Sequence, residues 1–227
     1  MIQQARSLTP KEQFANVNFE EASAERMPFQ HDSSVDMIVA AQAAHWFDQA
    51  KLFPEMERIV RKGGTLAFWG YGDHVFVEFP RATKILRHYT HGRDSDLLGS
   101  YWPQPGRSVV QNKLRAIQPP SEGWDNVRRI EYEPGSEGAR SGTGTMFLYK
   151  RLTLRDCMNY IRTWSSFNAW QKVHPTAQSR EAGGRGDVVD EMFDRMRSAE
   201  PDWQSNGWEE IEIEIEWPTG LLLAKKR

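Results

Sequence analysis

Short apolar runs alternate with helical periodicity in the first third of the chain. Residues 35–41 read Val-Asp-Met-Ile-Val-Ala-Ala between polar flanks, which is typical of a buried parallel strand. In residues 48–60 the apolar side chains recur at the spacing of one helical face. We expect Gly63-Gly64 to end this helix and residues 65–69 to form the next strand. A strand, a helix and a strand within about 35 residues predict a βαβ unit.

The two ends of the chain carry further signals. Residues 2–8 are typical of the end of an amphipathic helix, and residues 16–21 are a candidate for a short strand. Residues 209–217 alternate acidic and apolar side chains, as a half-buried strand does. A Pro-Thr-Gly turn separates them from an apolar run at residues 221–224. These last two segments predict an antiparallel hairpin that closes a mixed α/β sheet.

The middle of the chain differs in character from the segments on either side. Helices are predicted over residues 79–89, 152–170 and 188–197. Polar, glycine-containing stretches predict exposed loops at residues 135–145 and 178–186. We therefore expect a helical lid, residues 79–204, inserted into a sheet-forming core of residues 1–78 and 205–227.

Composition narrows the class of protein. The formal net charge of −2 over 227 residues gives no electrostatic reason to expect nucleic acid or an acidic membrane as a partner. No apolar run approaches the roughly 18 residues of a membrane span, and the first residues do not resemble a signal peptide. The single cysteine, Cys157, excludes an intrachain disulfide and a cysteine-based zinc cluster. His88 and His91 have no third metal ligand nearby, so we expect no metal site. Because a single cysteine is typical of a reducing compartment, we expect a cytoplasmic protein.

Several short motifs carry a resemblance to a known family. They include Ala-Ser-Ala-Glu-Arg-Met-Pro-Phe at residues 22–29, Gln-Ala-Ala-His-Trp-Phe at 42–47, Arg-Lys-Gly-Gly at 61–64 and Tyr-Ile-Arg-Thr-Trp-Ser at 160–165. Their order and spacing resemble class I S-adenosylmethionine (SAM) dependent methyltransferases, and most of all the fungal trans-aconitate-methyltransferase-like branch. The resemblance covers nearly the whole chain. It implies a Rossmann-like sheet with a helical lid, SAM as the cofactor and a small-molecule acceptor in fungal secondary metabolism.

The chain departs from this family at its front. The resemblance places residues 1–5 after the family's second strand, so the glycine-rich loop and the acidic residue that hold the cofactor would lie upstream. We therefore expect an N-terminally truncated sheet in which SAM binding is weakened or lost. Because the family's first strand is a central one, the strand at residues 35–41 is expected to have an unpaired edge. A homodimer or a partner subunit would cover that edge.

The resemblance implies cofactor contacts at two places. Ser23-Ala24-Glu25 matches the family's adenine-binding turn, in which the backbone N–H of Ala24 would donate to the ring. Family members often have Asp where this chain has Ser23. Gln42 and Ala43 follow the predicted parallel strand, at the end where α/β sheets place ligands, and this segment borders the methionine moiety in the family. A plain strand-to-loop turn is the alternative explanation of the first motif.

His45 is the candidate general base, because imidazole titrates near neutral pH. Methyl transfer can also proceed by positioning the acceptor alone, and a histidine packed beside a core tryptophan gives the same pattern. The resemblance implies a substrate cavity lined by Trp46, Trp102, Arg107, Tyr160, Arg162 and Trp164. Arginine side chains suit carboxylates, and trans-aconitate methyltransferase methylates a carboxylate. The alternative is an aromatic helix face in the core with solvated arginines.

Three functions remain open from the sequence. The first is a SAM-dependent methyltransferase acting on a small molecule. The second is a SAM-independent isomerase or cyclase that uses the same cavity. The third is a non-catalytic partner subunit with a methyltransferase fold, which pairs through its exposed strand edge.

Overall fold

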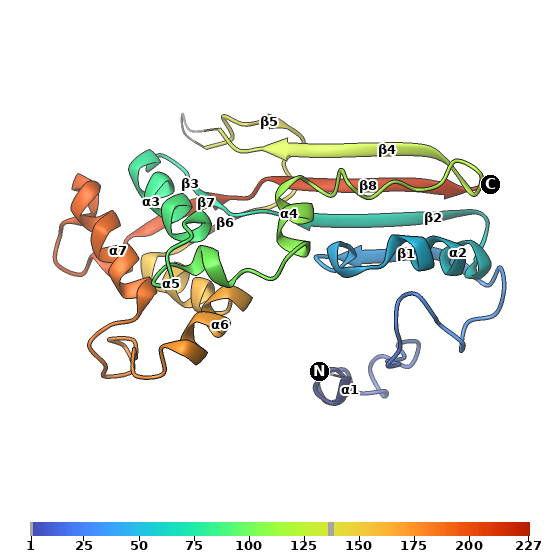
Figure 1. The fold of residues 1–227 in the computed structure, drawn as a ribbon, viewed down its shortest axis with the longest axis horizontal. Coiled ribbons are helices and arrows are strands. Elements are labelled where there is room, and N and C mark those ends of the chain that lie inside the picture. Colours follow the sequence, from blue (N-terminus) through green and yellow to red (C-terminus); the bar gives the residue numbers. More distant parts are fainter. Residues whose placement is uncertain (1, 136–138) are drawn as a thin grey trace.

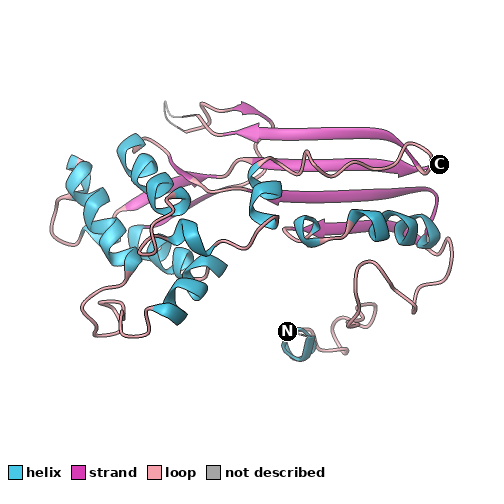
Figure 2. Ribbon diagram, viewed as in Figure 1, coloured by secondary structure: helices cyan, strands magenta, loops and turns pink. Residues whose placement is uncertain are grey.

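A computed structural model describes residues 2–135 and 139–227. Figure 1 shows an elongated molecule with a β-sheet at one end and a group of helices at the other. Figure 2 shows the long strands gathered in the first part and most of the helices in the second. Each part is packed around its own cluster of buried apolar side chains. The two parts therefore have separate cores.

Five strands form the main sheet, in the order β1-β2-β8-β4-β5. They are β1 (Val35–Ala41), β2 (Val60–Tyr71), β8 (Thr219–Lys226), β4 (Trp124–Glu133) and β5 (Thr143–Gly144). β1 and β2 are parallel, whereas the other neighbouring pairs are antiparallel, so the sheet is mixed. In the part of the chain that the structure describes, β1 pairs with β2 alone, so its outer edge is unpaired there.

One face of the main sheet is covered by helices and the other is open. The first face carries α2 (Gln49–Ile59) and α4 (Gly106–Gln111). On this face Leu66 and Phe68 of β2 are fully buried. Side chains alternate along a strand, so the residues between them point to the opposite face. There, Met37 and Val39 of β1 are 55% and 57% exposed.

The second part of the molecule combines a small sheet with the lid helices. Its sheet has the order β3-β7-β6, formed by β3 (Val75–Phe76), β7 (Glu212–Glu216) and β6 (Tyr149–Thr153). Its helices are α3 (Pro80–His91), α5 (Leu154–Arg162), α6 (Ser165–Val173) and α7 (Val188–Ala199), with 3-10 turns at Leu98–Tyr101, Pro201–Trp203 and Trp208–Glu210. Tyr89, Phe193 and Trp203 are fully buried between them. The remaining elements are α1 (Ile2–Leu8) and the 3-10 turn η1 (Ala44–Trp46).

The structure confirms the predicted strand at residues 35–41 and the helix that follows it. Asp48 caps this helix, because its side chain accepts from the N–H of Ala50. The predicted end of the helix was wrong. Val60 is already extended, so the helix stops at Ile59 and Gly63-Gly64 lie inside β2. The predicted strand at residues 16–21 is also absent from the structure, which describes that segment without regular hydrogen bonding.

The single helix predicted over residues 152–170 is three elements. Residues up to Thr153 belong to β6, and Thr153 caps α5 by accepting from the N–H of Asp156. The helix ends at Arg162, and an extended Trp164 begins α6. Local capping therefore overrides a continuous apolar periodicity.

The predicted C-terminal hairpin was wrong as a pairing, although both strands exist. β7 pairs with β3 and β6, whereas β8 pairs with β2 and β4. The reason is that Ile213 and Ile215 of β7 point into the lid core while Leu222 and Ala224 of β8 point into the sheet core. The chain crosses between the two parts at the intervening turn.

The domain limits at residues 79 and 204 remain a prediction. The segment between them is not purely helical, because β4 and β5 belong to the main sheet. The predicted loop at residues 135–145 falls partly outside the described residues, and β5 lies in its second half. No helix among the described residues is long and apolar enough to cross a membrane.

Candidate functional site

The carboxyl ends of β1 and β2 are held together by one glutamine. Gln42 follows β1 with a positive φ of 50°. Its side-chain Nε2 donates to the carbonyl of Tyr71 at 2.9 Å, and its Oε1 accepts from the N–H of Tyr71 at 2.9 Å. The N–H of Gln42 itself donates to the carbonyl of Trp69. This predicted cofactor residue therefore ties the ends of two parallel strands together, where α/β sheets bind ligands.

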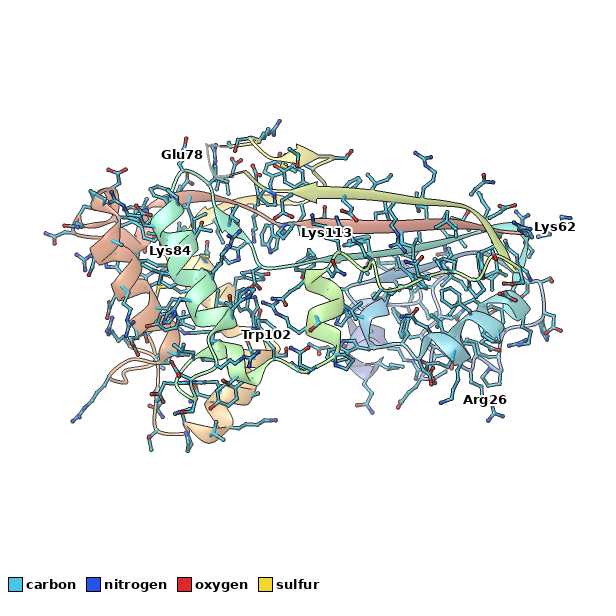
Figure 3. All side chains as sticks on the ribbon, turned by 45° about the horizontal axis from the view of Figure 1, so that its top comes forward. Arg26, Lys62, Glu78, Lys84, Trp102 and Lys113 are labelled. Carbon is cyan, nitrogen blue, oxygen red and sulfur yellow. The ribbon has the colours of Figure 1, made fainter. Side chains whose placement is uncertain are left out.

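The predicted adenine turn lies beside the start of α2. Ser23 and Arg26 close the turn, and the hydroxyl of Ser23 donates to the carboxylate of Glu25. The other oxygen of Glu25 accepts from the N–H of Asp48 at 2.9 Å, which anchors the turn to the first residues of the helix. The hydrogen bond from Ser23 lowers the pKa of Glu25. Figure 3 labels Arg26, the last residue of this turn.

The backbone, rather than the side chains, of this turn is available to a ligand. Ser23 and Glu25 bond each other, whereas the N–H of Ala24 donates to no group among the described residues. Ala24 and Ala43 both pack against the core beneath α2. The turn and the end of β1 thus lie over the same apolar cluster.

His45 and Trp46 lie under the first residue of α4. A Cβ at Gly106 would come within 2.8 Å of the Trp46 ring and 2.9 Å of the His45 ring, so only glycine allows this approach. Burial lowers the pKa of His45, and its Nδ1 is buried without a hydrogen-bond partner among the described residues. The imidazole is therefore neutral near pH 7, and it lies on the helix-covered side of the strand ends.

Arg107 and Trp102 form a charged and aromatic cluster between the two parts of the molecule. The guanidinium of Arg107 is buried, pairs with the carboxylate of Asp73 and lies 4.0 Å above the Trp102 ring. Burial opposes ionisation of Asp73, but the hydrogen bond from His91 and the charge of Arg107 hold its pKa at about 2. Trp102 lies between α3 and α4 (Figure 3). The positive charge of Arg107 is already neutralised within the protein.

Arg162 lies elsewhere, at the start of α7. Its Nε is 2.8 Å from the carboxylate of Asp187, and its Nη2 is 3.0 Å from that of Asp190. Asp187 and Asp190 also form the capping box of α7. Arg162 therefore anchors a lid helix, and the structure does not bring it together with the other predicted substrate residues.

Tyr160 and Trp164 belong to an aromatic cluster around a buried histidine. The ring of His74 is 1% exposed and lies 5.7–5.9 Å from the rings of Tyr160, Trp164 and Trp217. Burial lowers the pKa of His74 to about 4, and its Nδ1 has no partner among the described residues. The indole N–H of Trp217 donates to the hydroxyl of Tyr160 at 3.2 Å. Two members of this cluster, Tyr160 and Trp217, line a cavity.

The cavity has a volume of about 430 Å³ and opens beside the ends of β2 and β8. It is lined by Trp69, Tyr71, Phe147, Leu148, Tyr160, Trp217, Thr219, Gly220 and Leu221. Trp69, Tyr71 and Leu221 alternate with residues that face α2 and α4, so the cavity lies on the open face of the sheet. The Gln42–Tyr71 pair stands between the cavity and the helix-covered side, where His45 and the turn lie.

Of the predicted substrate residues, Tyr160 alone lines this cavity. Trp164 packs behind Tyr160, and Trp46, Trp102, Arg107 and Arg162 lie away from the wall. Sequence reasoning missed most of the wall, including Trp69, Trp217 and Thr219. The signals were present, because two tryptophans sit at strand ends next to Gly70 and Pro218. A larger cavity of about 640 Å³ lies among the lid helices, and paired charges such as Arg180–Asp194 line it.

Comparison with known proteins shows that the chain is similar to methyltransferases. Residues 1–68 match a family model described as "Methyltransferase domain". The chain is 28% identical, over 98% of its length and 72% of the relative's, to the Saccharomyces cerevisiae protein named "Probable S-adenosylmethionine-dependent methyltransferase CRG1". Among solved structures, the "Putative Type II Methyltransferase" of Anaeromyxobacter dehalogenans superposes with a TM-score of 0.59 at 22% identity, covering 96% of this chain and 77% of that one.

These findings confirm the predicted fold class. The mixed sheet with its helices matches the Rossmann-like fold of methyltransferases. The narrower resemblance to the fungal trans-aconitate-methyltransferase-like branch remains a prediction.

Proposed function

We propose that this protein is a SAM-dependent methyltransferase that acts on a small molecule. The observation that carries the proposal is the arrangement at the ends of β1 and β2. A turn whose Ala24 N–H has no partner among the described residues lies on one side of the Gln42–Tyr71 pair, and an aromatic cavity lies on the other. The name of the yeast relative, which matches nearly the whole chain, supports SAM as the cofactor.

The residues present fit part of a SAM site. The N–H of Ala24, which donates to none of the described residues, suits an acceptor nitrogen of adenine, and the apolar cluster under Ala24 and Ala43 suits the face of a ring. Ser23 and Glu25 hold the turn on α2, so we propose that they act by fixing the Ala24 donor. Bound SAM would supply an electrophilic methyl group on a sulfonium.

In this site the protein contributes mainly position. We propose that the cavity holds the acceptor atom in line with the methyl group, while the strand ends fixed by Gln42 set the distance between the two ligands. His45 does not line the cavity, so a catalytic role for it stays a prediction. Its contact with Gly106 indicates that it also positions α4.

Isothermal titration of the purified chain with SAM and with S-adenosylhomocysteine tests the proposal. Micromolar binding is expected, and Ala24→Pro, which removes the backbone donor, should weaken it by about tenfold. Ala22→Pro, the same change two residues earlier, is the matched control. A folded sample that gives no heat at millimolar ligand would refute SAM use by this chain. Its mass in solution, measured alongside, tests the prediction that a second copy covers the edge of β1.

A further inference from the structure

The cavity beside β2 and β8 has mostly aromatic walls. Trp69, Tyr71, Phe147, Tyr160 and Trp217 present aromatic rings to it. Its volume of about 430 Å³ is within the usual range for a small-molecule site. Aromatic walls favour planar apolar molecules, which gain contact area and ring stacking at once.

Charge selects further among such molecules. None of the described residues that line the cavity carries a formal charge. The two arginines that could have bound an anion are already paired, Arg107 with Asp73 and Arg162 with Asp187 and Asp190. A carboxylate or phosphate entering the cavity would lose its hydration without meeting a cation. The carboxylate preference expected from the family resemblance therefore does not fit this cavity.

Among the described residues, one buried polar atom of the wall has no hydrogen-bond partner. Thr219 is 3% exposed, and its Oγ1 makes no hydrogen bond to any of the described residues. The register fixes its position, because Thr219 is paired with Tyr71 on one side and Tyr132 on the other. A buried hydroxyl without a partner is unfavourable, and a hydroxyl can both donate and accept. A ligand group placed against Thr219 would remove that deficit.

We infer that this cavity binds an uncharged, planar, largely apolar molecule whose single hydrogen-bonding group pairs with Oγ1 of Thr219. The identification of this molecule as the methyl acceptor rests on the proposed function. The binding preference itself rests on the cavity alone.

Three probes of one shape test the inference, each titrated into the full chain at pH 7 without SAM. The probes are 2-naphthol, naphthalene and 2-naphthoate. Their binding is measured by calorimetry and by the fluorescence of the tryptophans that line the cavity. We expect 2-naphthol to bind at least about tenfold more tightly than 2-naphthoate, which is charged. In Thr219→Val the affinity for 2-naphthol should fall about fivefold, while the affinity for naphthalene stays unchanged or rises.

Thr65→Val is the matched control, because Thr65 lies on the same sheet but outside the cavity. It should leave all three affinities unchanged. Far-UV circular dichroism and a melting curve establish that each variant is folded, and if Thr219→Val does not fold, Thr219→Ser should retain 2-naphthol binding. Equal binding of naphthol and naphthoate, or equal naphthol affinity in Thr219→Val and wild type, would overturn the inference.

The probes also separate this inference from the proposed function. Binding of 2-naphthol in a chain that does not bind SAM would support the cavity's ligand class and refute the cofactor. SAM binding without 2-naphthol binding would support the cofactor and refute the ligand class of the cavity.

Discussion

Replacing Arg162 by methionine should destabilise the protein strongly, because Arg162 is the counter-charge of two buried carboxylates. Its guanidinium lies 2.8 Å from Asp187 and 3.0 Å from Asp190, whose side chains are 1% and 4% exposed. Removing one partner of a buried ion pair typically costs about 3–5 kcal/mol, because the remaining charge stays desolvated. With a urea slope of about 3 kcal/mol per M, the unfolding midpoint should fall by about 1–1.7 M.

The matched control lies on the same helix. Arg155 pairs with Glu209 and Glu210, but its side chain is 40% exposed. Exposed pairs contribute about 1 kcal/mol or less, so Arg155→Met should shift the urea midpoint by a few tenths of 1 M. An Arg162→Met variant within 1 kcal/mol of wild type, or equal to Arg155→Met, would refute the anchoring role and reopen the substrate role for Arg162.

The pH dependence provides an independent check of the same argument. Burial alone would raise the pKa of Asp190, but hydrogen bonds from the backbone of Asp187 and Arg180 and the charge of Arg162 lower it. A lowered folded-state pKa gives stability that is present above the unfolded pKa and lost as pH falls through the folded one. Without Arg162 the pKa of Asp190 in the folded state rises. The difference in free energy of unfolding between wild type and Arg162→Met should therefore become smaller below about pH 4.

Three further predictions concern the site. Thr219→Val should leave the free energy of unfolding of the ligand-free protein unchanged or raise it by about 1 kcal/mol, since the buried hydroxyl has no partner among the described residues; a clear loss in a urea titration would contradict this. Gly106→Ala should destabilise by about 1–3 kcal/mol, because the added Cβ meets the rings of Trp46 and His45, whereas Gly63→Ala meets nothing within 4 Å and tests the strain of a positive φ alone. His74→Phe should flatten stability against pH between about 4 and 6.5. The pKa of His74 is lowered to about 4, so the unfolded chain binds more protons than the folded one in that pH range, and the stability of the wild type falls as pH falls. An unchanged slope of the free energy of unfolding against pH in His74→Phe would contradict this.

The parts of the fold that sequence analysis predicted correctly are those set by local pattern. The helical face of Gln49–Ile59 and one face of the strand Val35–Ala41 pack against elements close in sequence. The strand was predicted to be buried, but its other face, with Met37 and Val39, is exposed. The partner of β8 was not predictable in this way. Its apolar residues fit a hairpin with β7 equally well, and the choice was made by two separate cores on either side of Pro218.

In the candidate site, too, local features could be predicted from the sequence, whereas features that depend on distant contacts could not. Gln42 and Ala24 could be singled out as candidates from the sequence, because strand ends and turns are local features. The lack of charge in the cavity could not be predicted from the sequence, because it depends on ion pairs between residues far apart in the chain. Arg107 is neutralised by Asp73, 34 residues earlier, and Arg162 by Asp187, 25 residues later. An arginine in a sequence is a candidate anion ligand until the carboxylate that faces it is known. Here both carboxylates belong to the protein, so neither arginine is left to bind an anion. Among the buried polar atoms of the described residues, Oγ1 of Thr219 is the one on the cavity wall without a hydrogen-bond partner, which turns the expected acceptor from an anion to a neutral molecule.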